Sequence, residues 1–318
     1  MVKYKTDILL ATYNGSAYLP ELLASLDAQS NQNWRLIARD DGSTDSTVKQ
    51  LKDWAANLGD RFVLLEDGRK NLGSMLNFGA LFDRSDAEYV MPCDQDDFWV
   101  PDKIERLTSH MKRLEEKHGE GTPLIVHSDL IVSDVNLEPI ADSFWEYQRI
   151  RLPPDNEPWK ILTIQNAVTG CAMIGNRALM DIALPIPDEA MMHDWWLALA
   201  AALFGKISVE TTPTVQYRQH ESNALGARDS SMSGLLWLIA SRPSMYYLQA
   251  KDAIRRSQSQ AGSASERFIN LLTYEQRVFL EDYAHLGNCG FFKRKIFPIR
   301  HQLYYKDFVR SAGFLGVL

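Results

Sequence analysis

The sequence predicts an α/β fold, in which a mostly parallel sheet is flanked by helices and followed by a helical C-terminal region. Up to about residue 107, apolar runs of strand length alternate with segments of helix length, as in β-α-β units. Polar clusters follow several of these strands at the point where each strand should end. Open α/β sheets bind ligands at that edge, so the same pattern also predicts a ligand site.

The elements of the first half can be assigned in order. "TDILLATYN" reads as a buried strand that stops at the turn signal Asn14-Gly15, and the segment after it has helical spacing. We expect Ser43 or Thr44 to cap the second helix. The later strands are "WRLIARDD", "RFVLLED" and "AEYVMPCD", and the helices between them are "STVKQLKDWAANLG" and "LGSMLNFGALFDRS".

The second half continues the mixed pattern and then becomes helical. "PLIVHSDLIVSD" predicts a pair of strands, "AVTGCAMIGNRAL" a strand that enters a helix, and "HDWWLALAAALFG" an apolar helix. "ISVETTPTVQYRQH" predicts one or two further strands. We therefore expect one α/β domain at 1–225, with halves 1–107 and 108–225, and a mainly helical region at 226–318.

Composition limits the functions that remain. The net charge of −7 argues against a general nucleic-acid binder, which would carry a basic face. Three widely spaced cysteines offer neither a disulfide framework nor zinc spacing, which favours the reducing cytoplasm. The N-terminus lacks a cleavage site, and no apolar run approaches the roughly 18 to 20 residues of a membrane span.

The stretch "YVMPCDQDDFWVP" places Asp94, Asp96 and Asp97 within four positions at the end of a strand. Like charges this close are unfavourable unless something neutralises them. Carboxylate oxygens suit a hard divalent cation, and such a cation would make a diphosphate a better leaving group. The alternative is an acidic first turn of the following helix, which explains one carboxylate better than three.

A second polar cluster, "RDDGSTDST", follows the second strand. The glycine patterns of dinucleotide-binding and phosphate-binding loops are absent from the chain's first strand–helix connection, so carboxylates and backbone would have to hold a nucleotide there. Asp40 and Asp41 are placed to accept from a base N–H or a sugar hydroxyl. The alternative is a helix-capping turn, which Asp, Gly and Ser all favour.

These motifs together resemble a known family. "ATYNG", "RDDGSTDST", "NLG" and "CDQDDFWVPDKI", in this order, look like the nucleotide-sugar half of a family 2 glycosyltransferase. The resemblance covers about residues 5 to 225 and implies the GT-A fold, a Rossmann-like sheet flanked by helices. "VHSDLIV", "NAVTGCAM", "HDWW" and "YRQHESNA" extend it toward the bacterial rhamnosyltransferase-like branch.

The resemblance implies roles for individual residues and a Mn²⁺ or Mg²⁺ cofactor. The metal would be held by Asp96 and by His220, with Asp94 shared between ribose and metal. The acceptor side or the surroundings of the ligands would include Asp97, Asp129, His193 and Trp195, the last as a sugar-stacking ring or as core. Contacts to the nucleotide or donor sugar are implied for Thr12, Asn14, Asp40, Asp41, Asn71, Asp94, Gly170 and Arg218.

The catalytic base implied by the resemblance is Asp194, in "MMHDWWLAL". An inverting transfer needs a base that removes a proton from the acceptor hydroxyl as its oxygen attacks the anomeric carbon. The family more often has Glu-Asp at this place, whereas this chain has His193-Asp194. The alternative is that Asp194 only caps the helix that follows.

The function that follows is an inverting, metal-dependent glycosyltransferase of the cell-surface polysaccharide pathways. Its donor would be a dTDP- or UDP-sugar, with L-rhamnose as one candidate, and its acceptor a saccharide or a lipid-linked saccharide. The alternatives are a non-catalytic nucleotide-sugar or glycan-binding protein and a nucleotidyltransferase. The presence of both Asp96 and Asp194 favours the enzyme over the binding protein, and "ATYNGSAYL" lacks the basic residues of a triphosphate loop.

The C-terminal segment from 288 to 318 differs in charge from the rest of the chain. Aromatic residues are interleaved there with six basic residues and a single acid, Asp307. This composition fits either a peripheral membrane surface, at the inner face of the cell membrane, or a helix packed on the catalytic domain. A homo-oligomer is also left open. The basic residues are Lys293, Arg294, Lys295, Arg300, Lys306 and Arg310.

Overall fold

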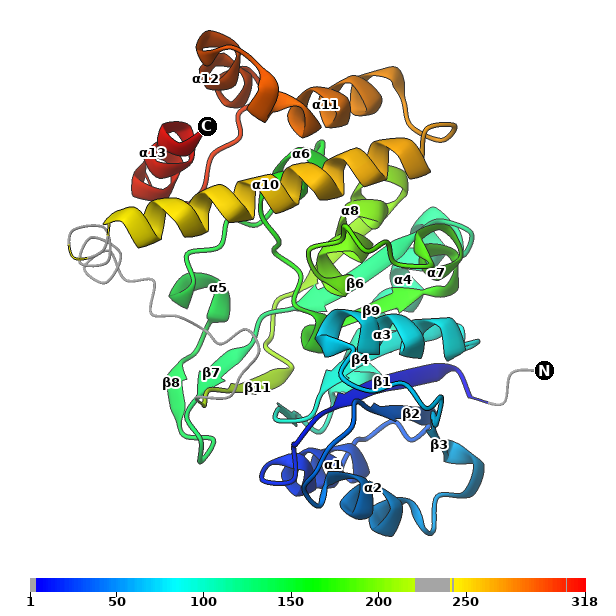
Figure 1. Ribbon diagram of the computed structural model, residues 1–318. Coiled ribbons are helices and arrows are strands. Elements are labelled where there is room, and N and C mark those ends of the chain that lie inside the picture. Colours follow the sequence, from blue (N-terminus) through cyan, green and yellow to red (C-terminus); the bar gives the residue numbers. More distant parts are fainter. Residues whose placement is uncertain (1–3, 221–240, 242, 307) are drawn as a thin grey trace. The chain divides into compact units, whose positions relative to one another are not determined.

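The computed structural model describes residues 4–220, 241, 243–306 and 308–318 (Figure 1). The chain divides into two compact units. The first is made of 1–144, 168–185 and 204–227, and the second of 145–167, 186–203 and 228–318. Two segments within the predicted domain 1–225 therefore pack with the C-terminal region. Residues 226–240, at the start of the predicted helical region, lie outside the described part.

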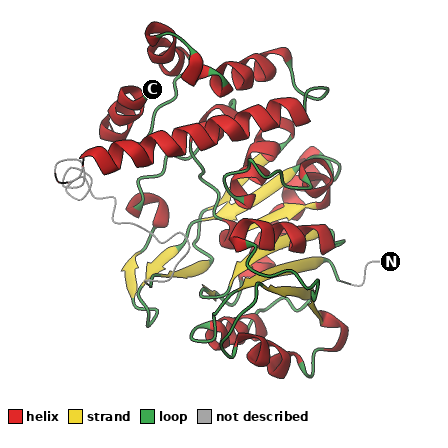
Figure 2. Cartoon of the chain, viewed as in Figure 1, coloured by secondary structure: helices red, strands yellow, loops and turns green. Residues whose placement is uncertain are grey.

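The first unit is built on a seven-stranded sheet of order β10-β6-β9-β4-β1-β2-β3, which confirms the predicted α/β class (Figure 2). β9 pairs antiparallel with both of its neighbours, and the other described pairs of this sheet are parallel. The strands are β1 (Thr6–Thr12), β2 (Trp34–Asp40), β3 (Phe62–Leu64), β4 (Tyr89–Asp94), β6 (Leu124–Ser128), β9 (Met173–Asn176) and β10 (Lys206–Glu210).

Helices of this unit lie beside the sheet and bury apolar stripes. In α1, the leucines 19, 22, 23 and 26 recur at helical spacing and are at most 3 % exposed. Together with strand residues such as Ile8 and Leu36 they form one continuous core. The helical elements are α1 (Leu19–Asp27), α2 (Thr47–Ala55), η1 (Gly59–Arg61), α3 (Gly73–Arg84), α4 (Lys103–His118), η2 (Gly170–Ala172) and α7 (Arg177–Ala183).

The predicted cap of α2 was wrong. The helix begins at Thr47, and the backbone N–H of Thr47 donates to the carboxylate of Asp45 at 3.0 Å. The hydroxyl of Ser43 instead donates to Asp40, and the N–H of Thr44 donates to Asn14. Ser43 and Thr44 make hydrogen bonds within the connections before the helix, because the polar groups there also need partners.

A second, four-stranded sheet completes the first unit, in the order β5-β11-β7-β8. The strands predicted as a pair in "PLIVHSDLIVSD" therefore belong to different sheets, β6 to the large one and β7 to the small one. β11 pairs antiparallel with β5 and parallel with β7. The strands are β5 (Phe98–Trp99), β7 (Ile131–Ser133), β8 (Pro139–Ala141) and β11 (Val215–Arg218).

The second unit is helical in the part that the structure describes. Its core is aromatic: Phe279 packs edge-on against Trp159 at a centroid distance of 5.0 Å and lies 5.3 Å from Phe297. Trp196 of α8 stacks on Phe268, the residue that follows α10, at a ring-centroid distance of 5.4 Å, so α8 packs against the end of α10. The helices are α6 (Pro158–Ile164), α8 (His193–Phe204, whose last residue falls in the first unit), α10 (Pro243–Arg267), α11 (Tyr274–Ala284), η3 (Leu286–Asn288), α12 (Phe291–Arg300) and α13 (Phe308–Val317), while α5 (Phe144–Tyr147) spans a unit boundary.

None of the described helices is long and apolar enough to cross a bilayer. The longest, α10, has 25 residues and a polar average composition.

The entry into β10 generates a prediction about stability. A Cβ at Gly205 would lie 1.7 Å from the backbone carbonyl oxygen of Pro123, an atom that cannot move without disturbing β6. Gly205→Ala should therefore lower the free energy of unfolding by at least about 2 kcal/mol. Urea unfolding followed by circular dichroism measures it. Gly121→Ala is the matched control, because its Cβ would meet nothing within 4 Å. Equal stability of the two variants would contradict this account.

Candidate active site

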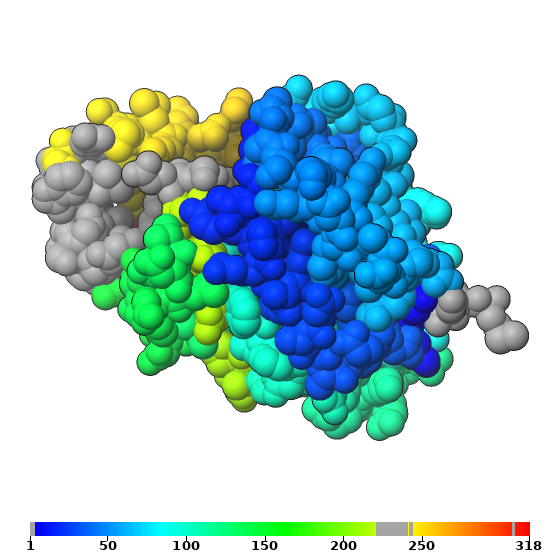
Figure 3. All heavy atoms as spheres, turned by 90° about the horizontal axis from the view of Figure 1, so that it is seen from below, coloured from blue at the N-terminus to red at the C-terminus, as the bar shows by residue number. Residues whose placement is uncertain are grey.

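The predicted polar clusters meet at one edge of the large sheet. β1, β2 and β4 are adjacent and parallel, so their carboxyl ends point the same way. In register, Thr12 lies beside Asp40, and Ala11 lies beside Asp94. The connections that leave these strands belong to the part of the chain that is coloured blue to cyan in Figure 3.

The connection after β1 is held by the connection after β2. Asp40 accepts from the Thr12 hydroxyl at 3.0 Å, from the Ser43 hydroxyl at 2.5 Å and from the Gly42 and Ser43 backbone N–H groups. Asn14 has a positive φ of 48°, and its side-chain oxygen accepts the Thr44 N–H at 2.8 Å. Asp40 therefore organises the turn after β2 without capping α2, while Asn14 is exposed beside it.

Asp41 faces inward and anchors a third connection. It is 4 % exposed, and its carboxylate accepts the backbone N–H groups of Leu72 and Gly73 at 2.9 Å, at the start of α3. Its carbonyl also accepts the N–H of Asn71, an exposed residue with a φ of 55°. Asp41 thus shapes the loop that carries Asn71, and contact of either residue with a base stays a prediction.

Arg39, which the sequence reasoning did not single out, holds this region together. Its side chain is fully buried and donates to both carboxylate oxygens of Asp67, to Asp41, to Asn77 and to the carbonyl of Arg69, at 2.8 to 3.1 Å. All five guanidinium N–H donors are thereby used. The hydrogen bonds from Arg39 hold the pKa of Asp67 well below its usual range, although burial opposes the shift.

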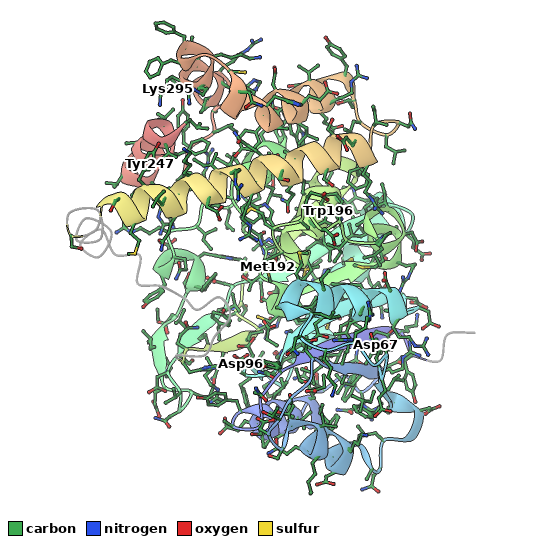
Figure 4. All side chains as sticks on the ribbon, viewed as in Figure 1. Asp67, Asp96, Met192, Trp196, Tyr247 and Lys295 are labelled. Carbon is green, nitrogen blue, oxygen red and sulfur yellow. The ribbon has the colours of Figure 1, made fainter. Side chains whose placement is uncertain are left out.

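The acids at the end of β4 have unequal surroundings. Asp96 is half-buried, and its Oδ2 lies 2.8 Å from Nε2 of His220 (Figure 4). Asp97 is fully buried, and in the described part of the chain its oxygens make no regular hydrogen bond, with only the Cys171 thiol close enough to act as a weak donor. Burial, and then the charges of Asp96 and Asp94, raise the pKa of Asp97 well above its usual value.

The same cluster contains the ligand atoms that a cation would need. Ligand atoms of Asp94, Asp97 and Cys171 lie within 4.8 Å of one another. Carboxylate oxygens suit Mg²⁺ and Mn²⁺, and a buried carboxyl without a regular hydrogen bond is the kind of group that a cation would satisfy. The Cys171 thiol fits less well, because burial raises its pKa and keeps it protonated. The carboxylates fit a hard divalent cation.

Lys103 supplies positive charge beneath the acids, although the sequence reasoning assigned it no role. It is fully buried, its ammonium donates to the carbonyl of Cys171, and it lies 3.2 Å from the centroid of the Trp99 ring. Burial lowers the pKa of Lys103 to about 8, and the neighbouring Cys171, Cys93, Asp97 and Asp94 act in the opposite direction.

His220 and Arg218 reach the cluster from the end of β11. The His220 ring stacks on Tyr18 at a centroid distance of 4.5 Å. Arg218 is 1 % exposed and donates to the carbonyl of Asp96 at 2.9 Å, to the carbonyl of Val135 and to the carboxylate of Glu21. In this arrangement Arg218 fixes the backbone at Asp96.

The residues predicted around the donor sugar and the acceptor are engaged locally. Asp129 is 6 % exposed and accepts the backbone N–H of Leu130 at 2.8 Å and the Ser143 hydroxyl at 2.5 Å. Gly170 begins η2 and is buried with it. Burial lowers the pKa of His127 to about 4, so this imidazole is neutral at pH 7.

The predicted base belongs to the second unit, in the first turn of α8. Asp194 is half-buried and is the second residue of α8, and its Oδ1 accepts the N–H of Trp195 at 2.6 Å, a contact within the first turn and not a cap before the helix. His193 is 3 % exposed, and burial lowers its pKa to about 3, which keeps it neutral. Trp195 donates through Nε1 to the carbonyl of Leu162 at 2.5 Å, whereas Trp196 is core.

Comparison with known proteins gives a family match. The profile described as "Glycosyl transferase family 2" matches residues 7–179. The dTDP-rhamnosyl transferase RfbG of Shigella flexneri is 25 % identical over 232 residues, which is 70 % of this chain and 75 % of that protein. The putative glycosyltransferase EpsE of Bacillus subtilis is 29 % identical over 136 residues, 42 % of this chain; that match spans about half of the relative's own length, 48 %.

Among solved structures, this chain resembles TarS of S. aureus. Residues 1–349 of that protein superpose with a TM-score of 0.52 at 18 % identity, covering 95 % of this chain and 93 % of the other. The complex of the same fragment with UDP-GlcNAc gives a TM-score of 0.50 at 17 % identity, again with 95 % and 93 % coverage. These matches support the GT-A fold.

Arg39 generates a prediction about stability and its pH dependence. Arg39→Gln leaves Asp41 and Asp67 without their buried counter-ion and should lower the free energy of unfolding by about 3 kcal/mol at pH 7. Because the folded-state pKa of Asp67 is depressed, this advantage of the wild type is present above the unfolded pKa of about 4 and shrinks as pH falls toward the folded value.

Urea unfolding at several pH values measures both effects. Arg69→Gln is the control: its side chain is 57 % exposed and also contacts Asp67, so its loss should cost less than about 1 kcal/mol. If the free energy of unfolding of Arg39→Gln differs from that of the wild type by the same amount at pH 7 and at acidic pH, the role given to the Arg39–Asp67 pair is refuted.

Proposed function

The chain belongs to glycosyl transferase family 2 and is a glycosyltransferase, and we propose that it moves one sugar, with inversion, from a nucleoside diphosphate to an acceptor hydroxyl. The observation that carries the proposal is the set of carboxylates at one edge of a parallel sheet, with Asp94 and Asp96 at the end of β4 and Asp40 at the end of β2. An edge of this kind is where open α/β sheets receive ligands.

In this proposal the donor nucleotide lies along the connections that follow β1 and β2. Thr12 and Asn14 would line one side, and the loop anchored by Asp41, with Asn71 exposed on it, would line the other. A dTDP- or UDP-sugar is the proposed donor class. The name of the Shigella flexneri relative supports a dTDP-rhamnose donor, whereas the S. aureus structure was solved with UDP-GlcNAc.

A Mn²⁺ or Mg²⁺ ion would be held by Asp96 and Asp94, with His220 beside them and Asp97 behind. When bound, it would neutralise the charge that develops on the departing diphosphate. The chain's own residues fix these oxygens: Arg218 holds the backbone at Asp96, and Lys103 lies beneath the acids. His220 already contacts Asp96 and would have to share that oxygen or turn toward the ion.

Asp194 is the proposed base. Its carboxylate would take the proton of the acceptor hydroxyl while that oxygen bonds to the anomeric carbon and the bond to the diphosphate breaks. Attack from the side opposite the leaving group inverts the anomeric centre. Burial lowers the pKa of the neighbouring His193 to about 3, so this imidazole is a weak base and would not compete for the proton at pH 7.

The acceptor would be a saccharide or a lipid-linked saccharide in cell-surface polysaccharide synthesis, with the enzyme in the cytoplasm at the inner face of the membrane. Half-buried Trp195 is the proposed acceptor contact, because Trp196 is fully enclosed. A protein that binds a nucleotide sugar without turning it over is the second candidate, favoured by the local bonds that Asp40, Asp41 and Asp194 already make.

Replacement of the proposed base tests the mechanism. Asp194→Asn should lower kcat for transfer by about a hundredfold or more, because the amide cannot accept the proton. Binding of UDP or dTDP with Mn²⁺, measured by calorimetry, should not change. Asp188→Asn is the control, an exposed carboxylate in the same unit. Undiminished transfer would exclude Asp194 as base, and a wild type without turnover on any donor would favour the binding protein.

Replacement of the proposed metal ligand tests the donor site. Asp96→Ala should weaken Mn²⁺-dependent binding of the nucleoside diphosphate at least about tenfold, because a charged oxygen ligand is lost. Chelation of the metal should weaken wild-type binding to the same level and leave the variant unaffected. Asp86→Ala, whose side chain is 66 % exposed, is the control. If neither chelation nor the Asp96 substitution changes the affinity for the nucleotide, the assignment of Asp96 as a metal ligand is rejected.

A further inference from the structure

α12 exposes more apolar surface than a solvated helix needs. Phe292, Ile296 and Ile299 are 78 %, 56 % and 55 % exposed, and Phe291 at the helix start is 60 % exposed. Single exposed apolar residues are ordinary, but four on a ten-residue helix form a patch. The sequence alone could not distinguish this arrangement from a basic helix with its aromatic rings turned inward.

The spacing of these residues gathers them on one side of the helix. Positions 292, 296 and 299 are separated by four and three residues and therefore share a face. The opposite side is already occupied: Phe297 is 5 % exposed and lies 5.3 Å from Phe279 and 6.2 Å from Tyr283 in ring-centroid distance. The helix is thus packed by one face and presents the other, apolar face outward.

The charges of the helix are basic and only partly compensated. The sequence of α12 contains four cations and no acid. Lys293 pairs with Asp282 at 2.8 Å, an exposed contact of little strength. In the described part of the chain no carboxylate pairs with Arg294, Lys295 or Arg300, and Lys295 donates instead to backbone carbonyls of α13 and lies 5.3 Å from the Phe291 ring (Figure 4).

We propose that α12 docks on the surface of an anionic phospholipid bilayer and lies in the plane of the interface. Its apolar stripe of Phe292, Ile296 and Ile299 would enter the boundary between headgroups and acyl chains, and the exposed Lys293 and Arg300, which flank the stripe, would meet lipid phosphates. The inference concerns this helix alone and does not depend on the proposed sugar transfer.

Charge favours a membrane over a second copy of the chain. An isologous dimer through this face would bring two acid-free basic helices together, and like charges across an interface are unfavourable. An anionic bilayer offers both the apolar layer and the opposite charge. The rest of the chain is acidic, since the whole protein carries a net charge of −7, so attraction to such a surface would be confined to basic segments.

Vesicle binding tests the apolar contact. The full chain should co-sediment with vesicles of phosphatidylcholine and phosphatidylglycerol, and Phe292→Ser/Ile296→Ser should lower the partition coefficient at least about tenfold. Both side chains are exposed, so the fold should survive, which circular dichroism verifies. The matched control is Ile140→Ser/Leu248→Ser, two residues 50 % and 63 % exposed outside α12, which should bind as the wild type does.

The charge contribution is tested with the same vesicles. Lys293→Gln/Arg300→Gln should weaken binding by about fivefold for each cation removed, and added salt should weaken the wild type more than this variant. Arg84→Gln/Arg113→Gln, on α3 and α4, is the control with the same loss of charge. On vesicles of phosphatidylcholine alone, the Lys293→Gln/Arg300→Gln variant and the wild type should be equal.

Three results would overturn the proposal. The first is failure of the wild type to bind the anionic vesicles at all. The second is a loss of binding in the control variants as large as the loss in the α12 variants. The third is a wild type that sediments as a dimer and becomes a monomer on Phe292→Ser/Ile296→Ser, since α12 would then be covered by a second copy.

Discussion

The carboxylates at the end of β4 can stand together only because cations and a fixed backbone oppose their repulsion. Asp97 is enclosed without a regular hydrogen bond in the described part of the chain, and Asp94 and Asp96 both raise its pKa. Lys103 acts in the opposite direction from beneath, and Arg218 holds the carbonyl of Asp96 from the side. The carboxylates therefore repel one another even without a ligand, and a cation that binds here would reduce that repulsion.

That constraint accounts for the second sheet. Arg218 is the last residue of β11, and β11 pairs with β5, the two-residue strand that immediately follows the acids. Lys103 is the first residue of α4, so the turn between Asp97 and Lys103 is fixed at both ends. The small sheet and the start of α4 thus hold the loop from Asp94 to Asp97 against the large sheet. Without these contacts the end of β4 would leave the acids unfixed.

The sequence predicted the elements whose causes are local. Apolar runs and turn residues located β1, β2 and β4, and the parallel register then brought Thr12 and Asp40 together as expected. The reversed direction of β9, the separation of β6 and β7 into two sheets, and the buried partners Arg39 and Lys103 were not predicted. These depend on contacts between residues far apart in the chain, such as Lys103 with Cys171, which no local pattern encodes.

The acids of β4 and the proposed base are positioned by different parts of the chain. The acids of β4 and their partners are packed by the sheets, whereas Asp194 stands on α8, whose neighbours include Phe268 of the helical unit and whose Leu203 carbonyl accepts from Gln276 of α11. Segment 186–203 leaves the first unit after α7 and the chain returns to that unit before β10, so the packing of the helical unit fixes the position of Asp194. Substitutions in that packing would therefore act on the proposed base through α8, and not through the contacts that hold the acids.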